Sequence, residues 1–105
     1  IYAIVQNDDS KKLIRELTNR RISVTRISST GGFLHNGNST LMIGVEPDRL
    51  EETLDIIKEK SSTRKEYMVV PSAVPGYIDN SPAPVQVTMG GATVFVVDVE
   101  QFYKY

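Results

Sequence analysis

Two apolar runs, each followed directly by a helix-like pattern, constrain the fold of this chain more than any other feature. The first run, Tyr2–Val5, contains β-forming residues and ends at the polar cluster Gln6–Ser10, which predicts a buried strand followed by a helix start. Apolar residues then recur at helical spacing at Leu13, Ile14 and Leu17. We expect this first helix to run from about Asp9 to Arg20, with Asp8 or Asp9 capping its exposed amides.

The second unit repeats the same order of patterns. The run Leu41–Val45 predicts a strand, and Glu46–Asp48 marks the next helix start, because proline is tolerated in a first turn and acidic residues complement the helix dipole there. The buried stripe of this helix consists of Leu50, Leu54 and Ile57. We expect the helix to end near Lys60 and Ser61.

A strand and a glycine-rich segment separate the two units. Between Ile22 and Ser28 apolar and polar residues alternate, which is typical of a half-buried strand with Ser23 and Thr25 on one face. The segment Thr30–Thr40 contains three glycines among polar residues. Such a composition predicts a loop with positive-φ backbone.

The last third of the chain combines β-prone runs with prolines. Arg64–Val70 predicts a strand, and the connection after it contains Pro71, Pro75, Pro82 and Pro84, so it is expected to be an extended loop. Val85, Val87 and then Thr93–Val99 form the last strand pattern. Gly90 and Gly91 interrupt it, which favours a bulge or the close approach of a ligand.

The resulting order is β-α-β-β-α-β with an added strand, which is typical of the α+β ferredoxin-like fold. In that fold two helices pack on one face of an antiparallel sheet. A length of 105 residues fits a single domain covering residues 1–105. The other sheet face would stay uncovered in a monomer, so we expect oligomerisation.

Composition excludes several classes of function. The formal net charge of −1 provides no basic field for a nucleic-acid polymer. The absence of cysteine excludes disulfides and thiol nucleophiles, and no apolar stretch approaches the ~18 residues that span a bilayer. With no export signal after Ile1, we expect a cytoplasmic protein without a membrane partner, and a few natural residues preceding Ile1.

The glycine-rich segment is the strongest candidate for chemistry, because consecutive glycine amides can form a nest for phosphate oxygens. Its spacing matches neither the P-loop nor the dinucleotide-binding fingerprint, so a plain hairpin loop and a ligand loop both stay open. Phe33 and Leu34 favour the ligand loop, because an apolar pair in a polar loop needs a nucleobase or a neighbouring subunit as its partner.

Catalytic and metal-binding patterns are weak. His35 is the sole histidine, which excludes a metal site of several imidazoles. No base and nucleophile pair is apparent, so we expect no catalytic residue, no metal and no cofactor. The basic run of Lys58, Lys60, Arg64 and Lys65 alternates with glutamates and indicates a solvated surface.

Longer strings of residues carry a family resemblance. Thr30–Leu34, Gly37–Thr40, Ile43–Val45 and Gly90–Val96 together resemble the PII-like cyclic di-AMP receptor proteins (DarA/PstA type) of Gram-positive bacteria, over essentially the whole chain. The resemblance implies a homotrimer of ferredoxin-like subunits that binds cyclic di-AMP in clefts between subunits. It also implies a non-enzymatic second-messenger sensor whose loops become ordered on binding and which signals to an unknown protein effector.

The resemblance also assigns ligand contacts by position. They fall on Thr25, Gly32, Phe33, Leu34, Asn38 and Gly44, with Gly90, Gly91 and Ala92 as the neighbouring subunit's wall of the cleft. Ser23 stands where family members can carry arginine, so a phosphate contact is either lost or supplied by Arg21 or Arg26.

Two alternatives remain open at this point. One is a PII-like regulator that binds ATP or another metabolite. The other is a small hydrolase of phosphate esters or acylphosphates with the same fold, although the glycine-rich segment lacks the arginine that such acylphosphatases use.

Overall fold

The computed structural model describes residues 1–27, 37–69 and 84–105. Its helices and strands follow one another in the order β1 (Tyr2–Gln6), α1 (Asn7–Asn19), β2 (Ser23–Ile27), β3 (Asn38–Gly44), η1 (Pro47–Arg49), α2 (Leu50–Ser61), β4 (Arg64–Val69), β5 (Pro84–Met89) and β6 (Ala92–Phe95). Here η1 is a single 3₁₀ turn that leads into α2. In the described part of the chain, no helix is long and apolar enough to cross a membrane.

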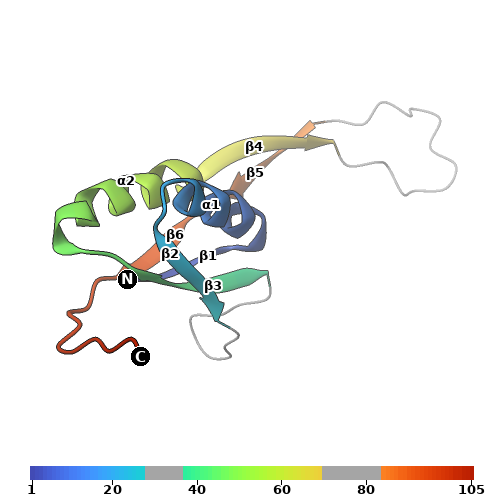
Figure 1. Cartoon of the computed structure of the whole chain (residues 1–105). Helices are drawn as coiled ribbons and strands as arrows, with labels where there is room; N and C mark the ends of the chain where they lie inside the picture. The colour runs from blue at the N-terminus through green and yellow to red at the C-terminus, as the bar shows by residue number, and fades with distance from the viewer. Residues whose placement is uncertain (28–36, 70–83) are drawn as a thin grey trace, which may run out of the picture.

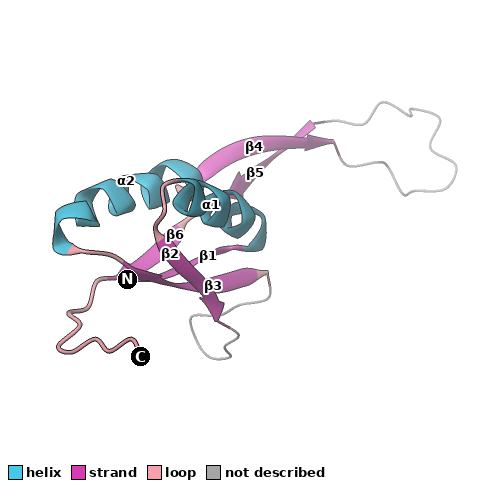
Figure 2. Ribbon diagram, in the orientation of Figure 1, coloured by secondary structure: helices cyan, strands magenta, loops and turns pink. Residues whose placement is uncertain are grey.

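Four strands form the main sheet in the order β2-β3-β1-β6, and all neighbours are antiparallel. The connections β1-α1-β2 and β3-α2-β6 are therefore two interleaved βαβ units, and both helices lie on one face of the sheet (Figures 1 and 2). This arrangement confirms the predicted ferredoxin-like fold.

The core lies between that sheet face and the two helices. Alternate residues of β1 and β3 point inward, while the helices contribute residues at helical spacing. The fully or almost fully buried apolar residues are Ala3, Val5, Leu13, Leu17, Ile22, Leu41, Ile43, Ile56 and Ile57. At ~1.5–3 kcal/mol for each large buried side chain, this cluster is the main favourable contribution to folding of the main sheet and helices.

Two strand boundaries differ from the sequence prediction by three residues or more. β3 begins at Asn38 rather than Leu41, because Asn38 pairs with Gln6 and extends the ladder into the polar segment. The last strand ends at Phe95 rather than Val99, because its register on β1 ends where Phe95 meets Tyr2. Residues 96–99 are exposed and belong to no described strand.

The other two strands, β4 and β5, form a separate two-stranded antiparallel sheet, here called the arm. The arm projects away from the main sheet (Figure 1). The glycine pair, for which the sequence predicted a bulge or the close approach of a ligand, forms no bulge within one strand. It is the point where the chain leaves the arm and enters the main sheet. Gly90 and Gly91 have φ values of 82° and 103°, so both adopt the left-handed backbone that glycine tolerates best.

The predicted cap of α1 is wrong. Gln6 is the N-cap residue, and its side chain makes no capping bond to the described residues of the helix. Asp8 and Asp9 lie inside the first turn, where their charge still complements the helix dipole. Asp9 is fully buried and binds Arg64 at the start of the arm.

Candidate ligand site

Three of the predicted ligand residues share the open face of the main sheet, the face away from the helices. In β3 the side chains of Ser39, Leu41 and Ile43 are buried, so Asn38 and Gly44 lie on the opposite face. Thr25 of β2 is exposed and pairs with Met42, which also lies on the open face. The strand alternation thus brings Thr25, Asn38 and Gly44 to one surface.

These three residues do not lie together: Thr25 and Gly44 lie near one end of the β2–β3 hairpin, and Asn38 lies at the other end. Gly44 pairs with Ser23, so Thr25 is its diagonal neighbour at ~7–8 Å. Asn38 lies six residues from Gly44 along β3, which is ~20 Å at the rise of an extended strand. A ligand that contacts both ends has to be elongated, with recognisable groups at each end.

Thr25 lines a surface depression of about 390 Å³ together with Arg21 and Ser23. Arg26 alternates to the other face and donates a 3.4 Å hydrogen bond from Nη2 to Asn7 Oδ1. Arg21 adopts a left-handed backbone, with φ 59°, just before β2. Of the two arginines predicted as substitutes for a phosphate contact at Ser23, Arg21 is therefore the one that lines the same depression as Thr25.

Asn38 lines a second depression, of about 360 Å³, at the other end of the hairpin. The residues that share it are Gln6, Asn7, Asp8 and Gly37. Amide and carboxylate groups dominate this lining, so it offers hydrogen-bond donors and acceptors rather than an apolar clamp. Such groups can recognise the edge of a nucleobase.

The predicted wall residues Gly90, Gly91 and Ala92 lie beyond β1, at the opposite edge of the main sheet from Thr25. Ala92 pairs with Val5 at the start of β6. Strands β2 and β6 are separated by β3 and β1, so ~14 Å lies between them. Within one chain, Thr25 and the wall residues therefore do not meet.

The backbone amides of the two glycines already have partners within the chain. Gly90 N–H donates to Gln6 Oε1 at 2.8 Å, and Gly91 N–H donates to the Ser61 carbonyl at 2.6 Å. A Cβ added at Gly90 would lie 2.4 Å from the Ser62 carbonyl oxygen. The arm base approaches closely here, so packing of the chain on itself is sufficient reason for both glycines.

Gly91 and Ala92 line a third depression, of about 290 Å³, beside the C-terminal end of α2. The other lining residues are Leu54, Ile57, Lys58, Ser62, Thr63 and Val94. Gly32, Phe33 and Leu34 lie outside the described residues, as does His35. The described candidates thus fall at three places on the subunit.

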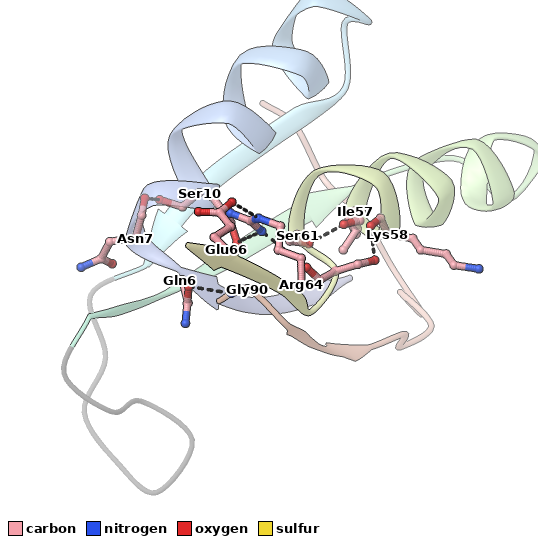
Figure 3. A network of polar contacts seen from close by, with 11 residues as sticks. Gln6, Asn7, Ser10, Ile57, Lys58, Ser61, Arg64, Glu66 and Gly90 are labelled. Atoms are coloured by element: carbon pink, nitrogen blue, oxygen red, sulfur yellow. Dashed lines mark hydrogen bonds and ion pairs between the residues drawn. The ribbon is translucent and has the colours of Figure 1, made fainter. Parts of the chain in front are cut away.

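Sequence reasoning missed an ion pair at the base of the arm. Arg64, predicted to be solvated, donates from Nη2 and Nη1 to the two carboxylate oxygens of Asp9 at 2.8 and 3.2 Å (Figure 3). The hydrogen bond to Asp9 is the largest influence on the Arg64 guanidinium and raises its pKa, assisted by the bond to Glu66. No local pattern could reveal this pair, because its members are 55 residues apart.

The open face also carries a row of large exposed side chains. Tyr2 pairs with Met42 on one side and with Phe95 on the other, and the three are 39, 43 and 42 % exposed. Contiguous apolar surface of this kind is typical of an interaction site.

Fold and site together define a class of protein: a ferredoxin-like binding subunit with a projecting arm and ligand candidates on its open sheet face. A family model described as "Cyclic-di-AMP receptor" matches residues 1–105, and the chain belongs to this family. It is therefore a PII-like signalling protein that binds cyclic di-AMP, as the resemblance predicted.

A solved structure supports the fold independently. A functionally unknown protein from Pediococcus pentosaceus ATCC 25745 is 41% identical in sequence and superposes with a TM-score of 0.79. The match covers 99% of this chain and 93% of that one.

Proposed function

We propose that the chain senses cyclic di-AMP without catalysing a reaction, as a homotrimer whose ligand sites lie between subunits. The observation that carries this proposal is the placement of Thr25 and Ala92 on opposite edge strands of the same sheet. A second subunit can bring its β6 edge to the β2–β3 hairpin of the first. The exposed row of Tyr2, Met42 and Phe95 supplies apolar surface for such an assembly.

The ligand chemistry agrees with this arrangement. A cyclic dinucleotide is elongated and presents two phosphates and two purines. The Thr25 hydroxyl and the Arg21 guanidinium are suited to a phosphate, and the Asn38 side chain can pair with the donor and acceptor edge of adenine. Phe33 and Leu34 complete the proposed site as an apolar clamp, with Gly32 and Gly44 allowing close approach.

The remaining parts of the proposal concern signalling. Binding orders the glycine-rich segment and thereby changes the surface that a protein effector meets. We place this exchange in the cytoplasm, in a single domain of residues 1–105, and without metal or cofactor. Membership in a receptor family supports a binding role over hydrolysis, and favours cyclic di-AMP over ATP.

Calorimetric titration with cyclic di-AMP, cyclic di-GMP and ATP tests the ligand. We expect cyclic di-AMP to bind most tightly, because guanine reverses the donor and acceptor pattern that Asn38 reads. Thr25→Val should weaken binding, whereas Thr88→Val, the same change at an exposed strand position of the arm, should not. Equal affinity for the two cyclic dinucleotides would contradict the assignment.

Mixing two blocked variants tests whether the site lies between subunits. Gly44→Phe obstructs the hairpin side, and Ala92→Phe obstructs the proposed wall. A mixed assembly contains interfaces in which a normal hairpin meets a normal wall, so binding should recover partly after the two inactive variants are mixed and reassembled. If the mixture remains inactive while light scattering reports trimers, each site lies within one subunit.

A further inference from the structure

The junction between β1 and α1 is contacted from two directions. On one side, Asn7 N–H donates to the Gly37 carbonyl at 2.7 Å, and Asn7 Oδ1 accepts from Ser39 Oγ and from Arg26 Nη2. Gly37 directly precedes β3, and Ser39 is the second residue of that strand. The first residue of the helix is therefore bound to the hairpin that carries Asn38.

On its other side the same junction holds the base of the arm. Asp9, two residues after Asn7, accepts both hydrogen bonds from Arg64, and Gln6 accepts the bond from the Gly90 amide (Figure 3). Arg64 also donates from Nε to Glu66 at 2.8 Å. Both strands of the arm are thus tied to Gln6 and Asp9 where they meet the main sheet.

The turn between these two sets of contacts is buried and hydrogen-bonded within itself. Asp9 and Ser10 are fully buried, and Ser10 Oγ donates to the Asn7 carbonyl at 2.7 Å. Helical backbone bonds further restrain the turn. Asn7 is thus connected through the first turn of α1 to Asp9, and Asp9 in turn binds the guanidinium of Arg64.

We propose that the first turn of α1 couples the β2–β3 hairpin to the arm, with Asn7 and Asp9 as its positioning residues. Binding at the hairpin would then change the arm, and by reciprocity a change at the arm would alter affinity at the hairpin. The coupling is a property of the chain alone. Its use in signalling rests on the proposed function, since cyclic di-AMP is the ligand that would act on the hairpin.

Hydrogen exchange in the ligand-free protein tests the coupling. Asn7→Leu removes the oxygen that accepts from Ser39 and Arg26, and Asn7→Asp retains an acceptor at the same place. We expect Asn7→Leu to speed exchange of the β5 amides by about fivefold or more, the lower end of couplings between protein sites. Asn7→Asp should restore the parental rates, and Asn19→Leu at the other end of α1 serves as the control.

The comparison separates coupling from general destabilisation. Rates are compared after urea unfolding has shown how far each variant lowers global stability. If the β5 amides exchange at parental rates in Asn7→Leu, or if Asn7→Asp disturbs them equally, the proposed coupling is wrong. Because no ligand is present, this outcome is independent of whether cyclic di-AMP binds.

A second measurement adds cyclic di-AMP. We expect the ligand to change exchange in β5 of the parental chain. Asp9→Asn, which keeps at most one of the two bonds from Arg64, should retain calorimetric binding with a reduced response. Arg64→Gln is the alternative variant should Asp9→Asn fail to fold. Binding without a response of β5 in the parental chain, or a full response in both variants, refutes a signalling role. Absence of binding to the parental chain refutes the proposed function instead.

Discussion

Replacing Arg64 by methionine removes both hydrogen bonds to the Asp9 carboxylate while leaving most of the apolar side-chain stem. Asp9 is 0 % exposed, so its charge would then lie buried without its partner. Removing one member of a buried ion pair costs ~3–5 kcal/mol. Two features reduce this figure: the Arg64 side chain is 32% exposed, and the dipole of α1 stabilises a carboxylate in its first turn by ~0.3–1 kcal/mol. We expect Arg64→Met to lower the free energy of unfolding by about 2–3 kcal/mol.

The reciprocal change should cost less. Asp9→Asn removes the charge, but the amide oxygen still accepts one bond, and the guanidinium can turn toward Glu66 and water. We expect a loss of about 1–2 kcal/mol. Arg64→Met leaves a buried charge without a partner, whereas Asp9→Asn does not. The sharper prediction is therefore that Arg64→Met lowers the free energy of unfolding more than Asp9→Asn does.

Urea unfolding followed by circular dichroism measures both variants and the double variant. Protomer concentration is held constant, because the stability of an oligomer depends on it. The double variant should be less destabilised than the sum of the single ones, as expected for residues in contact. A loss below about 0.5 kcal/mol for Arg64→Met, the range of an ordinary surface change, would refute the reasoning. So would a larger loss for Asp9→Asn.

Three further outcomes are expected. Hydrogen bonding from Arg49, with a smaller contribution from Arg20, lowers the pKa of the Glu52 carboxyl below 4.5. The stabilising effect of this carboxylate is therefore complete above pH 4.5 and disappears as the pH falls through the folded-state pKa. Tm should fall less steeply below pH 4.5 in Glu52→Gln than in the parental chain. Gly90→Ala should cost about 2 kcal/mol or more because of its positive φ and the nearby Ser62 carbonyl, whereas Gly44→Ala, with no atom within 4 Å of the new Cβ, should leave chemical denaturation unchanged. Phe33→Ala should weaken cyclic di-AMP binding by roughly one to two factors of ten in calorimetry with little change in Tm; early melting with normal affinity would assign Phe33 to packing.

Much of the fold was predictable because its signals are local. The spacing of apolar residues along an element indicates which of its sides is buried. This holds for Leu13 and Leu17 in the first helix and for the β-forming runs Tyr2–Val5 and Leu41–Val45. Family membership followed from longer strings of residues, and the family match confirmed it. The ligand residues assigned by that resemblance remain predictions.

Other features depended on contacts between distant parts of the chain. The partition of the last strand pattern into β5 of the arm and β6 of the main sheet depended on which strand each part pairs with. Alternation placed Thr25 and Arg26 on opposite faces, and only the assembled sheet showed that Arg26 reaches Asn7.

The sequence by itself determined the helices, most of the strands and the family of this protein. Hydrophobic periodicity and the short motifs that carry the family resemblance are both patterns of residues close together in the chain. Only the tertiary structure decided that Asp9 binds Arg64 rather than capping its helix. A carboxylate in a first turn has the same local pattern in both cases. Which partner it takes depends on what burial brings within ~3 Å, and here that partner comes from 55 residues away.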